Sequence, residues 1–125
     1  MAAVRPVSKL ERAVLEELWA HGRAPVRTVL DALNADETRS PRAYTTVLTI
    51  VQRLQVKGLV RRVRDGKADL YEPTLGRAEY MSARAAAEVE GLIGEYGEYA
   101  LVQFARRTEQ LDPELREQLR KLADK

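Results

Sequence analysis

The chain has 125 residues, of which 45% are hydrophobic and 32% are charged, a balance typical of soluble globular proteins. It contains no cysteine, which excludes disulfides, thiolate metal sites and a cysteine nucleophile. No apolar run approaches the roughly 20 residues of a membrane span, and residues 1–10 lack the apolar stretch of a signal peptide. We therefore expect a cytoplasmic protein without membrane insertion.

The net charge of +2 is unevenly distributed along the chain. Residues 1–37 carry five basic and six acidic side chains, residues 38–75 carry eight and three, and residues 76–125 carry eight and ten. A basic middle between neutral-to-acidic flanks indicates one surface that faces a polyanion. A solvated charged stretch would give the same pattern, so charge alone favours neither interpretation.

The first 35 residues predict two amphipathic helices. The run Ser-Lys-Leu-Glu at residues 8–11 is a capping-box pattern that opens a helix continuing to about residue 20. Gly22 suits the left-handed residue that ends a helix. Pro25 fits the first turn of a second helix over residues 26–34. Apolar residues recur at helical spacing in both segments, so each helix should bury one face.

The third predicted helix has two unlike faces. Ser40 as N-cap and Pro41 at the first helical position open a helix over residues 42–57. One face is apolar at i, i+3, i+4 and i+7 spacing. The helix N-terminus near Ser40 favours a phosphate, because unpaired amides and the positive end of the helix dipole lie there. The other face carries hydrogen-bonding and cationic side chains: Arg42, Thr45, Thr46, Thr49 and Arg53.

A β-hairpin follows the third helix. Residues 59–64 and 68–72 are short β-type runs, and Asp65-Gly66 between them is the strongest short-range hairpin signal. Three helices followed by a hairpin are the layout of a winged helix-turn-helix. The hairpin, or wing, carries four basic side chains: Arg61, Arg62, Arg64 and Lys67.

The remaining residues predict helices again. An alanine-rich helix is predicted over residues 76–93 and a short helix over residues 99–107. Before the short helix, glycines 91, 94 and 97 favour a flexible segment. Asp112-Pro113 caps a last helix. These helices would pack on their own domain or on a partner subunit. Because residues 1–75 hold enough apolar side chains for a small core, we expect a homodimer. The predicted dimer contacts are Tyr80, Leu92, Leu101, Phe104, Leu111, Leu115, Leu119 and Leu122.

The expected fold is mainly α with a small β-hairpin: a winged helix-turn-helix domain at residues 1–75 plus C-terminal dimerisation helices at residues 76–125. The third helix and the hairpin together predict binding to double-stranded DNA. The major groove, about 12 Å wide, admits a helix and distinguishes all base pairs. The threonines suit base edges, Arg42 and Arg53 can reach phosphates or guanine edges, and the hairpin cations suit the phosphate backbone. An exposed helix face and edge-strand protection explain each feature singly, but their combination favours DNA.

Several segments together resemble the penicillinase repressor family. The resemblance covers residues 8 to about 124. The segments that carry it are Trp19, the run Ala-Tyr-Thr-Thr-Val-Leu-Thr at residues 43–49, Arg53-Leu54, residues 57–60, and the hairpin segment 64–68 with Tyr71. It implies a cytoplasmic homodimer that binds a palindromic operator and represses β-lactamase or related genes. It also implies that Tyr44 contacts a phosphate, that Thr45, Thr46 and Thr49 lie near base edges, and that the C-terminal helices form the dimer.

The chain departs from this family's pattern at two points. Members are inactivated when a sensor-linked protease pathway leads to cutting of an Asn-Phe bond, and the matching bond here joins Gln103 to Phe104. Copper-responsive members carry a cysteine motif in their tail, which this chain lacks. Metal sensing of that kind is therefore excluded, and no cofactor is expected.

No residue pattern indicates an enzyme. His21, the single histidine, lies at a helix end without a cysteine or paired carboxylates nearby. The rival function is a winged helix used only for protein–protein assembly, since fold alone does not decide function. Such a module would expose an apolar face on the third helix. A regulator induced by a small ligand near Tyr80, Tyr96 and Tyr99 is a third alternative.

Overall fold

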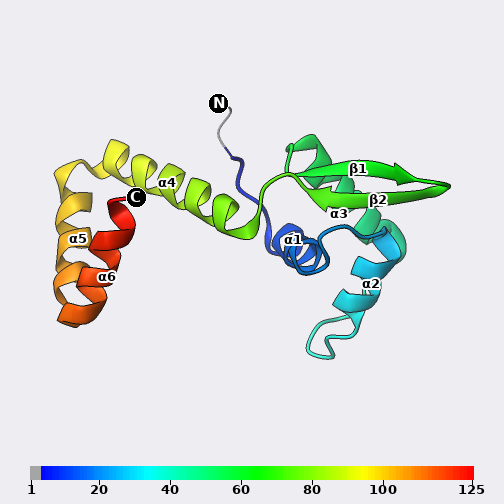
Figure 1. Ribbon diagram of the computed structural model, residues 1–125, viewed down its shortest axis with the longest axis horizontal. Coiled ribbons are helices and arrows are strands. Elements are labelled where there is room, and N and C mark those ends of the chain that lie inside the picture. Colours follow the sequence, from blue (N-terminus) through cyan, green and yellow to red (C-terminus); the bar gives the residue numbers. More distant parts are fainter. Residues whose placement is uncertain (1–3) are drawn as a thin grey trace. The chain divides into compact units, whose positions relative to one another are not determined.

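The computed structural model describes residues 4–125 (Figure 1). These residues form six helices and one antiparallel hairpin, which confirms the expected fold class. Contacts divide the chain into two compact units, the first ending at Arg84 and the second running from Ala85 to Lys125. The elements are α1 (Lys9–His21), α2 (Val26–Asn34), α3 (Tyr44–Val56), β1 (Val60–Asp65), β2 (Ala68–Pro73), α4 (Arg77–Tyr96), α5 (Glu98–Glu109) and α6 (Pro113–Ala123).

Helices α1, α2 and α3 share one apolar core with the base of the hairpin. Each helix turns the apolar face expected from its spacing toward that core. Burial of these aliphatic side chains is the main stabilising term of the unit, at roughly 25 cal/mol per Å² removed from water. The most deeply buried side chains are Leu15, Leu18, Leu54, Val14, Val29, Val47, Val51 and Val60.

The start of α1 forms the capping box that its sequence predicts. The Ser8 hydroxyl accepts a hydrogen bond from the Glu11 backbone N–H (3.1 Å), and Glu11 Oε1 accepts one from the Ser8 N–H (2.9 Å). Gly22 ends the helix with a φ of +82°, where a side chain would be strained. Both ends of α1 are therefore determined by residues within or beside it.

Helix α3 begins later than the sequence predicts. Ser40 and Pro41 lie in the preceding loop, and the N-cap is Ala43. Asn34 at the end of α2 accepts a hydrogen bond from the Arg42 N–H (2.8 Å) and donates one to the Arg42 carbonyl (3.0 Å). This pairing occupies the backbone groups of Arg42 and keeps the residue out of the helix. The phosphate-attracting N-terminus of the helix is accordingly at Ala43, not near Ser40.

Pro25 also differs from its predicted position. It is the N-cap of α2 in an extended conformation, not a residue of the first turn. The reason is a tertiary contact: Ala24 forms an antiparallel bridge with Tyr71 of β2, with N···O distances of 3.0 and 2.8 Å. The bridge keeps this segment extended up to the start of α2 and fastens the hairpin base to the helices.

The hairpin closes with a two-residue turn. Asp65 pairs with Ala68 across the strands, so Gly66 and Lys67 form the turn and Gly66 adopts a φ of +61°. Successive strand residues point to opposite faces of the hairpin. Arg62 is paired with Tyr71, which is buried against the core, and Arg64 lies on the same face farther along β1.

The first turns of α4 belong to the first unit. Tyr80 is only 3% exposed, and its ring centroid lies 5.4 Å from that of Trp19. The indole N–H of Trp19 donates a hydrogen bond to the Leu75 carbonyl (2.9 Å). The prediction that Tyr80 contacts a partner subunit is therefore wrong, because Trp19 offers it an aromatic surface within its own unit. Because of this packing, the first unit ends at Arg84 and not at residue 75, the predicted end of the first domain.

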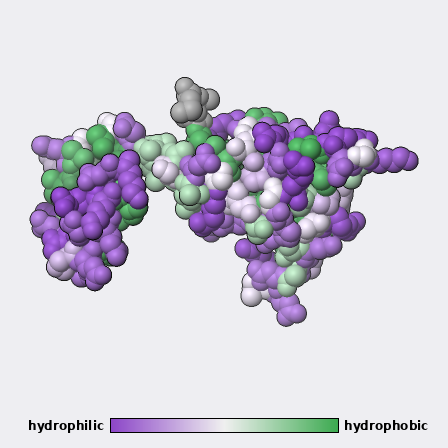
Figure 2. Space-filling model, in the orientation of Figure 1, coloured by the Kyte–Doolittle hydropathy of each residue, from purple (hydrophilic) through white to green (hydrophobic). Residues whose placement is uncertain are grey.

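The second unit consists of helices with exposed apolar side chains. Gly91 and Gly94 do not interrupt α4, whereas Gly97 ends it with a φ of +61°. Asp112 caps α6 as predicted, accepting a hydrogen bond from the Leu115 N–H (3.0 Å). Among its residues only Ala100 is buried, and Figure 2 shows hydrophobic side chains on its surface. No helix within residues 4–125 is long and apolar enough to cross a membrane.

Candidate nucleic-acid interface

The solvent-facing side of α3 is polar along its first turns. Thr45, Thr46 and Thr49 are exposed, while the opposite face of the helix is buried in the core. The Thr49 hydroxyl donates a hydrogen bond to the Thr45 carbonyl (2.9 Å). The Thr45 and Thr46 hydroxyls have no hydrogen-bond partner among residues 4–125. These two hydroxyls are therefore free to donate to or accept from a ligand.

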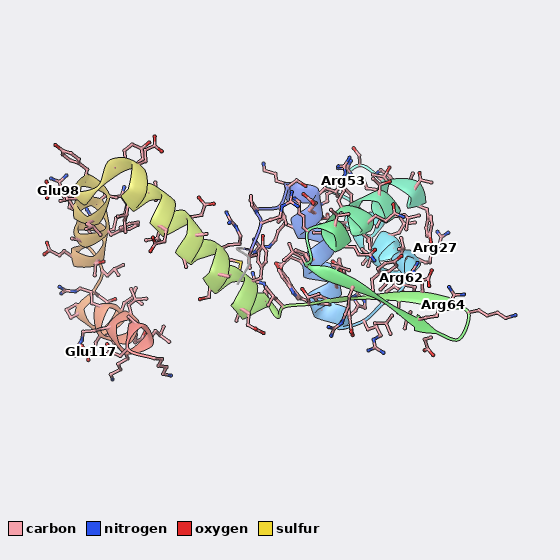
Figure 3. The ribbon with its side chains drawn as sticks, turned by 90° about the horizontal axis from the view of Figure 1, so that it is seen from above. Arg27, Arg53, Arg62, Arg64, Glu98 and Glu117 are labelled. Atoms are coloured by element: carbon pink, nitrogen blue, oxygen red, sulfur yellow. The ribbon has the colours of Figure 1, made fainter. Side chains whose placement is uncertain are left out.

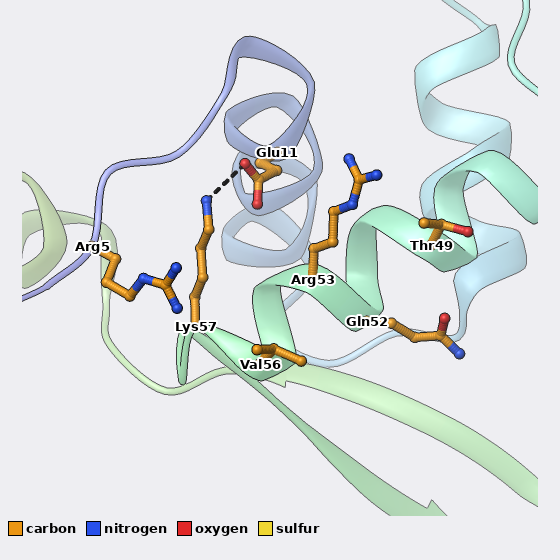
Figure 4. Close-up of a pocket in the computed structure, with 7 residues that line it drawn as sticks. All are labelled: Arg5, Glu11, Thr49, Gln52, Arg53, Val56 and Lys57. Carbon is orange, nitrogen blue, oxygen red and sulfur yellow. Dashed lines mark hydrogen bonds and ion pairs between the residues drawn. The ribbon is translucent and has the colours of Figure 1, made fainter.

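Two shallow hollows follow the exposed face of α3. The first, of about 270 Å³, is lined by Thr45, Thr46, Thr49, Ile50 and Arg53. The second, of about 480 Å³, is shown in Figure 4 and lies between the C-terminal half of α3 and the start of the chain. Thr49 and Arg53 line both, so the hollows form one surface along the helix. The second hollow is lined by Arg5, Glu11, Thr49, Gln52, Arg53, Val56 and Lys57.

The N-terminus of α3 carries a cation–aromatic pair. Arg27 of α2 lies 5.2 Å from the ring centroid of Tyr44, the first residue of α3. Ala43, the N-cap, has no side chain that could satisfy the first amides of the helix. Arg27 was not predicted from the sequence, since an exposed arginine on a short helix has no distinguishing pattern. Arg42 is exposed just before this point, with its backbone held by Asn34.

The wing cations differ in how they are paired. Arg61 forms an ion pair with Glu72 (2.7 Å), and Glu72 also pairs with Arg23 (3.0 Å). Hydrogen bonds from these two arginines lower the pKa of Glu72, so it remains ionised and the pairs persist. Arg64 pairs with Asp69 (3.2 Å). Exposed pairs of this kind are weak and can exchange partners.

Arg62 and Lys67 have no ion pair or hydrogen bond from their side chains within the described part of the chain. Arg62 and Arg64 share one hairpin face, and Figure 3 shows both on the side of the first unit where Arg27 lies. Arg61 points to the other face, where it pairs with Glu72, and Glu72 in turn pairs with Arg23 of the segment after α1. Of the four predicted wing cations, Arg62 and Lys67 are the most available to a polyanion.

The side chains predicted for the dimer contact are mostly exposed. Leu111 is half-buried and Tyr80, as described, is in the core of the first unit. Gln103 and Phe104 both lie inside α5, and Gln103 Oε1 accepts a hydrogen bond from Arg107 (3.0 Å). Exposed apolar side chains of this set are Leu92, Leu101, Phe104, Leu115, Leu119 and Leu122.

No group of three histidine, aspartate or glutamate side chains within residues 4–125 is arranged to hold a metal ion. The geometry instead presents an uncharged hydroxyl surface between cationic side chains. Such a surface suits an extended anionic partner with hydrogen-bonding groups between two charged edges.

Known proteins are similar in sequence to this chain along much of its length. The model of the penicillinase repressor family matches residues 7–125. The transcriptional regulator BlaI of Mycobacterium tuberculosis is 41% identical over 113 residues, which cover 86% of this chain and 77% of that protein. The penicillinase repressor of Bacillus licheniformis is 25% identical over 85 residues, which cover 68% of this chain and 64% of that protein.

Solved structures share the fold over about two thirds of this chain. The solution structure of the DNA-binding domain of the repressor BlaI matches with a TM-score of 0.50 and 26% identity, covering 64% of this chain and 94% of that one. Monomeric Bacillus licheniformis BlaI in complex with the blaP half-operator matches with a TM-score of 0.51 and the same identity and coverage. The chain therefore belongs to the penicillinase repressor family, with its winged helix formed by α1 to α3 and the β1–β2 hairpin.

Proposed function

We propose that this protein is a transcriptional repressor that binds double-stranded DNA through α3 and the β1–β2 wing. The observation that carries the proposal is the exposed threonine face of α3, which lies opposite a buried apolar face and is accompanied by Arg62 and Lys67, cations with no ion pair within residues 4–125. Threonine can hydrogen-bond to base edges or place its methyl group against a thymine methyl. The similarity to BlaI, one structure of which is a half-operator complex, supports the same function.

Different residues contact the base edges and the phosphate backbone of the DNA. The hydroxyls of Thr45 and Thr46 have no partner among the described residues, and both lie in the first turn of α3, which is the part of a recognition helix that contacts base edges. Tyr44 and Arg42 flank that turn and contact the phosphates of the adjacent strand. Arg62 and Lys67 of the wing contact phosphates farther along the duplex, where the interaction is electrostatic and independent of sequence.

The second unit makes the repressor a homodimer. Leu115, Leu119 and Leu122 form an apolar stripe along α6, and they are 40%, 44% and 62% exposed. Contiguous exposed apolar surface of this kind marks an interaction site. A twofold axis through that contact presents two recognition helices, so the operator is a palindrome with half-sites about 34 Å apart or a multiple of that spacing.

The regulated genes are β-lactamase or related genes, and the protein acts in the cytoplasm. A sensor-linked protease is the partner that would end repression. Cleavage between Gln103 and Phe104 requires α5 to unfold locally, because the bond lies inside the helix and the Gln103 carbonyl and side chain both accept hydrogen bonds from Arg107.

A gel shift tests the proposal directly. The purified chain is mixed with the DNA upstream of its own gene, with excess random competitor, across a salt series. We expect a discrete shift that resists the competitor, protects a palindrome and weakens steeply with salt. Absence of a specific complex with this DNA, followed by absence of enriched sites in a genome-wide pull-down, would instead identify a protein–protein assembly module.

A further inference from the structure

The start of the chain forms an anchored arm beside the C-terminal half of α3. We define this arm as residues 4–8. Its side chains Val4 and Val7 pack against the core of the first unit. The Val4 carbonyl accepts a hydrogen bond from Arg84 (3.0 Å), and the Pro6 carbonyl accepts one from Lys57 (2.9 Å). The residue before a proline favours an extended conformation, which applies to Arg5. Arg5 is therefore presented from a backbone that is held on both sides of it.

Lys57 joins the arm to two helices. Its ammonium group donates to Pro6 of the arm and to Glu11 Oε1 of α1 (2.9 Å), while Lys57 itself is the C-cap of α3 (Figure 4). Glu11 is 5% exposed. Burial alone would raise the pKa of Glu11, but hydrogen bonds from Ser8 and Lys57 outweigh burial and lower it. The carboxylate is thus charged and balances Lys57.

The remaining positive charge of this hollow lies on two guanidinium groups. Arg5 and Arg53 line it, both are exposed, and neither has an ion pair or side-chain hydrogen bond within residues 4–125. Guanidinium groups bind phosphate oxygens with two parallel hydrogen bonds. The chemistry of the hollow therefore favours an anion with phosphate-like geometry.

The shape of the hollow favours a polymer over a small molecule. Pockets for small ligands enclose most of the ligand surface. Here the volume is about 480 Å³, yet Val56 in its lining is 81% exposed, so the hollow is an open trough. A chain that enters at one end and leaves at the other fits such a trough.

The length of α3 is compatible with a DNA strand running through this trough. With 13 residues at about 1.5 Å rise each, α3 is about 20 Å long, whereas the major groove is about 12 Å wide. If α3 crosses the groove with its first turn on base edges, its far end reaches the sugar–phosphate backbone at the edge of the groove. The trough between the arm and α3 lies at that end.

We infer that this trough holds the sugar–phosphate backbone of one DNA strand, with Arg5 as a phosphate ligand and Lys57 as the residue that positions the arm. The inference rests on the proposed function and adds a backbone contact at the end of α3 away from Arg27 and Tyr44. The arm is thereby a third DNA-binding element beside the recognition helix and the wing.

Arg5→Ala in the full chain tests the contact, with a random-sequence duplex of about 30 base pairs, roughly three helical turns, as the probe. Fluorescence anisotropy across a salt series should show about eightfold weaker binding at about 0.1 M salt and a log–log salt slope smaller by about 0.9, the effect of one phosphate contact. Arg5→Lys should retain most of the affinity. Lys125→Ala, which removes one positive charge from the last residue, should change neither quantity.

A second variant tests the role of Lys57. Glu11→Gln combined with Lys57→Met removes the hydrogen bond to the Pro6 carbonyl without leaving a buried charge unpaired, while the Arg84 bond to the Val4 carbonyl remains. This pair should weaken binding by no more than Arg5→Ala does, and Arg5→Ala added to it should cause a smaller loss than Arg5→Ala causes in the otherwise unchanged chain. Fully additive losses would overturn the positioning role of Lys57.

The outcomes separate this inference from the proposed function. Wild-type protein that binds no duplex at all refutes the proposed function. Wild-type binding with an unchanged affinity and salt slope in Arg5→Ala overturns the arm contact alone. A loss in Arg5→Ala confined to the operator, with the random duplex unaffected, also overturns it, since that would be base reading. An unchanged thermal midpoint of Arg5→Ala excludes unfolding as the cause of a loss.

Discussion

The guanidinium of Arg27 lies 5.2 Å from the ring centroid of Tyr44, and the pair joins α2 to the first residue of α3. An arginine over an aromatic face is held in place by the ring quadrupole, at about 0.5–1 kcal/mol for an exposed pair. Tyr44 remains 42% exposed. Under the proposed function, we expect this pair to contact a phosphate of the DNA.

Removal of Arg27 should weaken DNA binding regardless of sequence. We expect Arg27→Ala to lower affinity for operator and random duplex by a similar factor, and to reduce the salt slope by about 0.9. Arg27→Lys should recover the charge but not the planar stacking, so its affinity should be intermediate. Anisotropy titrations at several salt concentrations measure both quantities. A loss limited to the operator would contradict a phosphate role.

Thr46 should show the opposite behaviour, because its hydroxyl lies at the start of α3 and has no partner in the part of the chain that the structure describes. Thr46→Val keeps the shape and removes only the hydroxyl, while Thr46→Ser keeps the hydroxyl and removes the methyl. If a base edge is read through the hydroxyl, the valine variant should lose about 1–3 kcal/mol on the operator and almost nothing on random duplex. Competition titrations measure the ratio of the affinities for operator and random duplex. Equal losses on both duplexes would show that Thr46 does not read bases.

The Lys57–Glu11 ion pair should matter for the stability of the first unit. Lys57→Met leaves the buried Glu11 carboxylate without its cation, and such a loss costs about 3–5 kcal/mol. Glu11→Gln added to Lys57→Met removes the unpaired charge and should recover much of the loss. Urea unfolding followed by Trp19 fluorescence measures each variant. A double variant as unstable as Lys57→Met would mean that the charge is not the cause.

The same pair predicts a pH dependence. Because the pKa of Glu11 in the folded protein lies below its ordinary value of 4.5, the folded state binds the proton less readily than the unfolded state. The stabilisation is complete above pH 4.5 and is lost as the pH falls through the folded-state pKa. The free energy of unfolding should drop less steeply on acidification in Glu11→Gln than in the wild type. Parallel pH dependences would contradict this assignment.

The apolar stripe of α6 should control the oligomeric state. Leu119→Asp introduces a charge into the proposed dimer contact and should yield monomers in light scattering at concentrations where the wild type is dimeric. Gln118→Asp adds the same charge to the neighbouring exposed position and serves as the control. Dimers that persist in Leu119→Asp would place the contact elsewhere.

Tyr80 should behave as a core residue and not as a dimer contact. Tyr80→Ala removes the ring that packs against Trp19 and should cost about 3–5 kcal/mol, as other buried aromatic truncations do. The monomer–dimer equilibrium of the protein that remains folded should be unchanged. Chemical unfolding and light scattering on the same samples distinguish the two roles.

The elements that could be predicted from the sequence are those set by residues close together in the chain. The capping box of Ser8 and Glu11, the hairpin at Asp65 and Gly66, and the Asp112 cap of α6 each depend on contacts within about four residues. The threonine face of α3 follows from helical periodicity alone. For this reason local sequence patterns are enough to predict both the fold class and the exposed threonine surface.

Contacts between residues far apart in the sequence decided the start of α3, the end of the first unit and the position of the arm. Asn34 holds the backbone of Arg42 and delays the start of α3, and Trp19 draws Tyr80 into the first unit. Lys57 reaches Pro6 across 51 positions of the sequence, and in doing so places the arm beside α3. No local propensity encodes such pairings, because they exist only once the hydrophobic core has brought the segments together. The sequence by itself thus determined which side chains α3 and the wing expose, whereas packing determined which backbone segments stand beside them.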